Sequence, residues 1–300
     1  MLFYEYLKSC REKFNLTQEE LTNELYNSHD EFKALDMVTV SRWERGVTHP
    51  STLRKKLILK LFQKYSHSTF ACFDHLSVLE IERKICELGI NNLFKKTKHH
   101  IVKFPVDIVE ADQVKILNIK ESEHYDNYIN IISKLIYKLT DSTVHINPNN
   151  FKEWALCSSS LFLISVYQDQ FFGFSFSIRL KKDIFEKIMN FEMSEKDIHK
   201  EHLASVDEKG CIYFLGFFAV SELSSSLLML RNYANFIANE RYILSYGRVT
   251  KTKEGIKLVT TIGLKKYKSF TENKNTQVSY RGVNSDVLLN ETLLKIIFKK

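Results

Sequence analysis

The segment from Asp36 to Gly46 predicts a short helix with both ends marked in the sequence. Asp36 belongs to the residue types preferred as N-caps, and glycine most often follows a helix end. Upstream, Thr17 and Glu20 stand at capping-box spacing, where each side chain satisfies the other's backbone N–H. Two short helices, the second polar and basic outside, can place side chains in a DNA major groove. The sequence therefore predicts a DNA-binding module near its amino end.

Apolar residues at helical spacing predict four helices in residues 1–65. Pro50 and Ser51 are expected to open the fourth helix. The residues expected to face inward are Phe3, Leu7, Cys10 and Phe14, then Leu21 and Leu25, then Val40 and Trp43, then Leu53, Leu57 and Leu61. Four helices in so short a segment predict a compact all-α domain with its own core.

Three motifs in this domain together resemble the XRE family, the Cro/repressor-type helix-turn-helix proteins. They are Thr17-Gln18-Glu19-Glu20-Leu21, Thr39-Val40-Ser41-Arg42-Trp43-Glu44-Arg45-Gly46 and Pro50-Ser51. The resemblance implies double-stranded DNA as the partner, with Gln18 on the duplex backbone. The residues it places at base edges are Met37, Val38, Thr39 and Arg42. The residues it places near phosphates are Ser41, Arg45 and Thr48.

Arg42 is the best candidate for reading DNA sequence. A guanidinium can bond guanine O6 and N7 together, which is worth roughly 1–3 kcal/mol. Met37 or Val38 would contact a thymine methyl group. One departure from the motif is the segment between Leu25 and Asp36, which is longer than the usual tight turn. It either extends the second helix or forms an extra loop.

The alternative is a purely structural helix bundle, because basic residues often mark only a solvated face. Residues 41–65 contain seven basic residues and one acid, Glu44. This asymmetry favours a phosphate-facing surface. One such module contacts a half-site, so the sequence also predicts a homodimer.

Composition limits the rest of the chain. Three hundred residues predict roughly two domains, and a net charge of +7 weakly favours polyanionic partners. The five cysteines are odd in number, widely spaced and lack a Cys-x-x-Cys pair, which predicts buried thiols and no metal site. No basic leader or apolar run of membrane length is found. We expect a cytoplasmic protein that does not bind a membrane.

Residues 66–103 are predicted to form a helical connector. Its apolar residues at helical spacing are Phe70, Phe73, Leu76, Leu79 and Ile85, and Gly89 is expected to end the helix. The basic run from Lys95 to His100 follows. We interpret it as an exposed loop, with a phosphate contact as the alternative.

Residues 104–300 alternate between strand and helix patterns. The expected strands are 114–120, 161–167, 171–178, 210–220, 243–249 and, as the last, 265–270. The expected helices are 125–139, 149–156, 184–189, 195–205, 224–239 and 252–262. The run from Gly210 to Val220 is apolar throughout, as in a central strand covered on both faces. The fold class is an N-terminal all-α domain followed by a mixed α/β domain.

This order, with Asp169-Gln-Phe-Phe-Gly173 and Thr250-Lys-Thr-Lys-Glu-Gly255 before Ile262-Gly263-Leu264, resembles the GNAT-type N-acyltransferases. That family implies a glycine-rich loop after the central strand, which holds the pyrophosphate of acetyl-CoA on backbone N–H groups. Here the place reads Val220-Ser221-Glu222-Leu223-Ser224-Ser225-Ser226, without glycine and with an acid. A carboxylate opposes an anion there.

We therefore predict no cofactor, with acetyl-CoA or another acyl-CoA as the alternative. A different polar ligand would meet Ser221, Glu222, Ser224 and Ser225; alternatively the serines only cap the helix. Glu222, His202 or Glu192 could act as a base and Tyr246 or Tyr267 as an acid, but no spacing pairs them. Cys211 is interpreted as a core residue. No residue is assigned to catalysis.

These patterns predict a sequence-specific transcription regulator. Its second domain would be a non-catalytic acyltransferase-like module that senses a small-molecule or protein effector, or dimerises. The competing hypothesis is an active N-acyltransferase, possibly toxin-like, joined to an autoregulatory DNA-binding domain.

Overall fold

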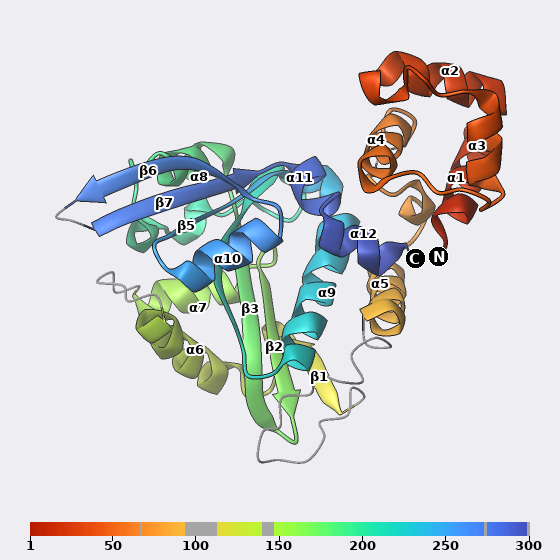
Figure 1. The fold of residues 1–300 in the computed structure, drawn as a ribbon. Helices are drawn as coiled ribbons and strands as arrows, with labels where there is room; N and C mark the ends of the chain where they lie inside the picture. The colour runs from red at the N-terminus through yellow and green to blue at the C-terminus, as the bar shows by residue number, and fades with distance from the viewer. Residues whose placement is uncertain (67, 94–112, 140–146, 273–274, 299–300) are drawn as a thin grey trace. The chain divides into compact units, whose positions relative to one another are not determined.

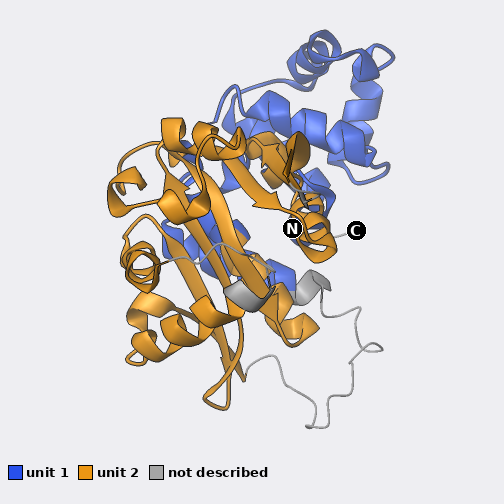
Figure 2. Cartoon of the chain, turned by 90° about the vertical axis from the view of Figure 1, so that its left-hand side faces the viewer, with its two compact units in different colours: residues 1–96, 233–241, 288–300 blue, residues 97–232, 242–287 orange. Residues whose placement is uncertain are grey.

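The computed structural model describes residues 1–66, 68–93, 113–139, 147–272 and 275–298. The chain divides into two compact units (Figure 2). Unit 1 is Met1–Lys96, Tyr233–Arg241 and Leu288–Lys300, and unit 2 is Thr97–Asn232 and Tyr242–Val287. The basic run from Lys95 to His100 lies outside the described residues.

The amino-terminal part of unit 1 is all helical, as predicted (Figure 1). Its elements are α1 (Phe3–Lys13), α2 (Gln18–Ser28), η1 (Asp30–Phe32), α3 (Met37–Glu44), α4 (Thr52–Phe62), η2 (Ala71–Phe73) and α5 (Val78–Leu93). The long segment after Leu25 both extends α2 and adds the turn η1.

The helix ends follow the local signals of the sequence. Thr17 Oγ1 accepts a hydrogen bond from the Glu20 N–H at 3.1 Å, and Glu20 Oε2 accepts one from the Thr17 N–H at 2.7 Å. Asp36 Oδ1 accepts the Thr39 N–H at 2.7 Å. Gly46 follows α3 with φ +69°, a conformation that side chains with a Cβ rarely adopt. Both predicted caps and the glycine stop are therefore confirmed.

The inward-facing residues predicted for α4 and the helix end predicted at Gly89 differ in part from the structure. In α4 the buried residues are Ile58, Leu59, Leu61 and Phe62, while Leu53 is 51% exposed and Leu57 half-buried. Leu61 is buried as predicted, but this helix has more leucines than one face can bury, so spacing alone also selected residues on its more exposed side. Leu79 is 73% exposed on α5. Gly89 lies inside α5 instead of ending it, because the helix continues to Leu93.

The carboxyl-terminal helix of the chain belongs to unit 1. This helix is α12 (Glu291–Ile297), and the Phe298 ring that follows it lies 5.0 Å from Phe3 and 5.2 Å from Tyr6, edge to face in both cases. Such ring contacts add to the apolar area that they bury. The end of the chain therefore completes the core of the helical unit, which no local pattern predicted.

Unit 2 is built on a seven-stranded mixed sheet, so the predicted α/β class is confirmed. Its strand order is β1-β2-β3-β4-β5-β7-β6. The strands are β1 (Val114–Asn118), β2 (Leu161–Tyr167), β3 (Gln170–Leu180), β4 (Gly210–Ala219), β5 (Ile243–Thr250), β6 (Lys265–Glu272) and β7 (Asn275–Gly282). β4 and β5 pair in parallel and the other neighbours are antiparallel. β4 is the central strand, as expected from its apolar run.

Side chains alternate between the two faces of the sheet, as strand geometry requires. One face carries Phe174, Phe176 and Ile178 of β3, in one core with residues of α6 (Tyr125–Leu139), α7 (Pro148–Leu156) and α8 (Lys182–Met189). On the other face Leu161 and Leu163 pack with Leu228 of α9 (Glu222–Ala238). The remaining helices are α10 (Lys253–Thr261) and α11 (Asn284–Leu288), with short turns η4 (Ile119–Glu121) and η7 (Glu240–Tyr242).

The differences from prediction in unit 2 that change its architecture lie at residues 195–205 and 275–282. The expected helix 195–205 is two separate turns, η5 (Glu195–Asp197) and η6 (Lys200–His202). The expected last strand is followed by β7, which inserts between β5 and β6. Alternation along residues 275–282 was too weak to mark this strand, and its pairing with β5 is a long-range contact. No helix among the described residues has the length and hydropathy needed to cross a membrane.

Candidate functional site

The exposed face of α3 carries most of the residues expected to contact DNA. Met37 and Val38 are 50% and 51% exposed. Arg42, Arg45 and Thr48 are exposed, Thr39 and Ser41 are half-buried, and Val40 and Trp43 are buried. The helix therefore presents its first turn and its arginines outward. The DNA contacts assigned to these residues stay predictions.

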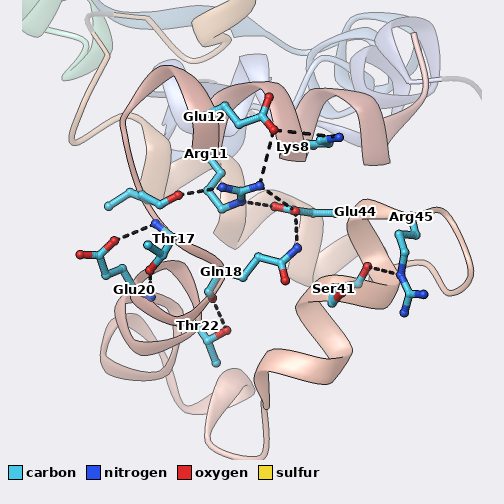
Figure 3. A network of polar contacts seen from close by, with 11 residues as sticks. Lys8, Arg11, Glu12, Thr17, Gln18, Glu20, Thr22, Ser41, Glu44 and Arg45 are labelled. Atoms are coloured by element: carbon cyan, nitrogen blue, oxygen red, sulfur yellow. Dashed lines mark hydrogen bonds and ion pairs between the residues drawn. The ribbon is translucent and has the colours of Figure 1, made fainter.

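Gln18 is held by another side chain instead of extending freely (Figure 3). Its Nε2 donates to Glu44 Oε2 at 2.8 Å. Arg11 Nε donates to Glu44 Oε1 at 2.6 Å, and its Nη2 donates to Oε2 at 3.1 Å. Glu44 is buried, and this forked pair joins α1 to α3. The lone acid of the basic segment is thus part of the domain's interior.

The expected ligand-binding loop at the start of α9 is partly used by the fold. Ser221 Oγ accepts the Ser224 N–H at 3.1 Å, and the buried Ser224 Oγ donates to the Phe172 carbonyl at 3.3 Å. Glu222 is exposed and Ser225 half-buried. Two of the four residues thus cap or anchor the helix, which was the alternative interpretation of the serines.

The parallel strands β4 and β5 are paired only near their amino ends. Their register runs from Gly210 opposite Ile243 to Tyr213 opposite Gly247. Both strands continue beyond this point, to Ala219 and Thr250, without further pairing between these described segments. On its other edge β4 has a β-bulge, because Gly216 and Phe214 pair with adjacent residues of β3. The sheet therefore opens at its centre.

Side chains replace the missing backbone pairs where the strands separate. The Tyr213 hydroxyl accepts the Val249 N–H at 3.3 Å, and Arg248 Nη1 donates to the Phe214 carbonyl at 2.8 Å. The Tyr213 hydroxyl in turn donates to a carboxylate oxygen of Glu195 from η5. Tyr213, Arg248 and Glu195 form what we call the strand-gap cluster.

Burial and charge set the proton affinities of the strand-gap cluster. Burial raises the pKa of the Glu195 carboxyl, against the opposing effects of the Arg248 charge and the Tyr213 hydrogen bond. Burial and the neighbouring carboxylate raise the pKa of Tyr213 well above its ordinary value. A buried carboxyl of raised pKa, bonded to a phenol, is suited to general acid–base chemistry.

The catalytic candidates considered from sequence do not come together. Glu222 and Glu192 are exposed, and Tyr267 is 48% exposed. The His202 ring accepts the His199 N–H at 3.0 Å, and the buried Tyr246 hydroxyl bonds Asn284 Oδ1 at 2.9 Å. Cys211 is a buried core residue, as predicted, and burial raises its pKa to about 11.

Sequence reasoning missed the strand-gap cluster entirely. Its three residues lie far apart in the sequence, and Glu195 was placed in an expected helix. The one signal present was Arg248, a charged residue in the apolar strand β5, since a buried charge needs a partner or a role. Among the described residues, no group of three His, Cys, Asp or Glu side chains could hold a metal ion.

Comparison with known proteins gives distant similarities to solved structures. No protein-family model and no curated protein matches the sequence. The N-acyl amino acid synthase FeeM from uncultured soil microbes is 12% identical with a TM-score of 0.41, over 60% of this chain and 96% of that one.

Two acetyltransferases are also similar. Microcin C7 self-immunity acetyltransferase MccE is 11% identical with a TM-score of 0.33, over 57% of this chain and 93% of that one. A probable GNAT-family acetyltransferase from Chromobacterium violaceum is 11% identical with a TM-score of 0.31, over 62% of this chain and 96% of that one. TM-scores below 0.5 do not establish a common fold, so the chain's own side chains must support a function.

Proposed function

We propose that unit 2 is an N-acyltransferase that moves an acyl group from a thioester to an amine. The observation that carries this proposal is the strand-gap cluster: a Glu195 carboxyl of raised pKa is bonded to Tyr213 where β4 and β5 separate. Perturbed titratable groups that meet in the centre of an α/β domain are candidates for catalysis. The expected resemblance to N-acyltransferases agrees with this assignment.

The cluster can manage the protons of this reaction. As the amine nitrogen attacks the thioester carbonyl carbon, a C–N bond forms and the nitrogen's proton passes to Glu195. The C–S bond breaks, and the leaving thiolate takes the proton of the Tyr213 hydroxyl. Glu195 then returns its proton to Tyr213 across their hydrogen bond. Acid–base assistance of this kind typically contributes about 10²–10⁴-fold to a rate.

The acyl donor should depend little on a diphosphate held at the start of α9. Glu222 is exposed there, and Ser221 already caps the helix. Acyl-CoA and a short acyl thioester without phosphates are therefore expected to serve comparably as donors. Comparable use of the two donors would agree with the prediction that no cofactor is held through its phosphates.

A direct assay tests the proposal. The full chain is incubated with acetyl, octanoyl and palmitoyl thioesters of coenzyme A and of N-acetylcysteamine, together with a pooled set of amines and amino acids. Thiol release and mass spectrometry of the products are followed. We expect amide products that need the protein; absence of enzyme-dependent amide from every donor would contradict the proposal.

A second candidate function, DNA binding by unit 1, is favoured by the exposed face of α3 and its capped start. Double-stranded DNA would be read by Arg42 with Met37, Val38 and Thr39, near phosphate contacts from Ser41, Arg45 and Thr48. Gln18, which bonds Glu44, would contact the DNA backbone. A homodimer would place two such helices on a two-fold operator, and acyl donors or acceptors would be its small-molecule effectors.

We expect Arg42→Ala to lose operator selectivity while the fold persists, because Arg42 is exposed at the end of α3. One lost bidentate contact to guanine corresponds to roughly 1–3 kcal/mol of discrimination. Selected duplexes are first recovered from a random pool with the wild type, and binding to them and to scrambled duplexes is then measured by fluorescence anisotropy. Lys60→Ala, on the same unit, is the control. Unchanged selectivity in the Arg42 variant would contradict the assignment.

A further inference from the structure

Arg248 has an unused hydrogen-bonding edge in the opening between β4 and β5. The residue is only 9% exposed. Its Nη1 donates to the Phe214 carbonyl at 2.8 Å. Its Nε is buried with no hydrogen-bond partner in the described part of the chain. A buried, unpaired donor on a charged group is costly, so such a group calls for an explanation.

The free Nε lies on the side of the guanidinium that suits an anion of matching shape. Nε and the adjacent Nη together form a planar fork, which binds both oxygens of a carboxylate through parallel hydrogen bonds. Because Nη1 is engaged with β4, the edge formed by Nε and the other terminal nitrogen is the one left for such a ligand. A carboxylate bound there would satisfy the orphaned donor and neutralise the buried charge.

Glu195, the second charged residue of the strand-gap cluster, is negative when its carboxyl group is ionised. The Tyr213 hydroxyl bonds both Glu195 and the N–H of Val249, the residue after Arg248, and Arg248 bonds the carbonyl of Phe214, the residue after Tyr213, so the three groups are neighbours. A ligand with an ammonium group beside a carboxylate complements this arrangement. Its amino group, after giving one proton to solvent, would face Glu195 as a neutral amine, and its carboxylate would face Arg248. Free α-amino acids have both groups on one carbon atom.

We propose that Arg248 binds the carboxylate of the acyl acceptor, and that this acceptor is a free α-amino acid. The inference rests on the proposed acyltransfer and makes its substrate class specific. Arg248 is then the residue that orients the amine toward Glu195. An amine without a carboxylate would leave Arg248 unpaired and would be a poor acceptor, because a buried polar group deprived of its partner rejects the analogue.

The experiment compares amino acids with their carboxyl amides in the wild type. Acceptors are tested singly in the thioester assay, each amino acid beside its amide and beside the amine that lacks the carboxyl group. We expect the acid to exceed both analogues by about a hundredfold or more in kcat/KM, the scale of losing a buried charge pair. Equal use of amides or simple amines would overturn the inference and leave the proposed acyltransfer intact. No transfer to any acceptor would overturn both.

Variants locate the effect at Arg248. Arg248→Met should lose the preference for acids: the kcat/KM ratio of each amino acid to the amine that lacks the carboxyl group should fall toward one, chiefly through a raised KM for the acid, whatever the variant does to the rate with both acceptors. Arg248→Lys keeps the positive charge but lacks the planar pair of donors. Its preference for acids should therefore lie between those of the wild type and of Arg248→Met. Circular dichroism and thermal unfolding check the fold of both variants. If neither variant folds, the wild-type comparison of amino acids with their amides and simple amines tests the inference by itself. An unchanged preference for acids in folded Arg248→Met would contradict the assignment.

Discussion

Replacing Glu195 by glutamine should lower the kcat of acyltransfer by about 10²–10⁴-fold, the usual contribution of a general base. Glutamine has nearly the same shape, and its amide oxygen can still accept the hydrogen bond from the Tyr213 hydroxyl. It cannot, however, take the proton of the attacking amine. The variant should therefore fold like the wild type, so that the loss appears in the rate and not in the yield of folded protein.

The pH profile separates a proton-accepting role from a structural one. Burial raises the pKa of Glu195, so the wild-type carboxyl ionises at higher pH than an ordinary glutamate. A base acts only when it is ionised, and the rate should rise with pH through this raised pKa. The Glu195→Gln variant should lack this rise. Stopped assays from pH 5 to pH 9 measure both proteins.

Glu192→Gln is the matched control, because Glu192 is an exposed carboxylate of the same region. It should keep both the wild-type rate and the wild-type pH profile. Tyr213→Phe should be slower through loss of the acid, without loss of the rise at higher pH. If Glu195→Gln retained the wild-type kcat and pH dependence, Glu195 would have no catalytic role and the proposed mechanism would fail.

Local signals predicted the elements of this chain well because those signals act within one turn or one strand. The caps at Thr17 and Asp36 were read from residues three positions apart. The bounds of α6, Tyr125–Leu139, follow from a regular apolar face. The central position of β4 follows from a strand that is apolar on both faces. In each case the sequence within the element is sufficient.

The features that matter for the candidate site depend on contacts distant in sequence. Nothing in residues 210–219 reveals that β4 stops pairing with β5 after Tyr213, because pairing is a property of both strands. The bond from Tyr213 to Glu195 spans a loop whose turns were expected to form a helix. The carboxyl-terminal helix joins the amino-terminal core through contacts between residues from opposite ends of the chain, such as Phe298 and Phe3. Such contacts require the tertiary fold.

Replacing Arg11 by methionine should destabilise unit 1 by about 3–5 kcal/mol, the cost of leaving one member of a buried ion pair alone. The Glu44 side chain is 2% exposed, and Arg11 holds both of its oxygens. Without Arg11, only the neutral Gln18 amide would still bond the carboxylate. Chemical denaturation, monitored by the fluorescence of Trp43 beside this pair in sequence, should show a lower midpoint for unit 1.

The double variant Arg11→Met/Glu44→Met tests the physical cause of this loss. Because it removes both charges from the interior, most of the lost stability should return, as apolar replacements of buried ion pairs are often neutral or stabilising. Lys8→Met, which removes an exposed charge from the same helix, should change the unfolding free energy little, because exposed ion pairs contribute little. If the double variant were as unstable as Arg11→Met, the loss would come from the Arg11 bond to the Leu16 carbonyl instead of the unpaired Glu44 charge. If the single variant loses stability and the double variant recovers it, the Arg11–Glu44 pair serves mainly to specify how α1 packs against α3. That packing in turn sets the direction in which Met37, Val38 and Arg42 point.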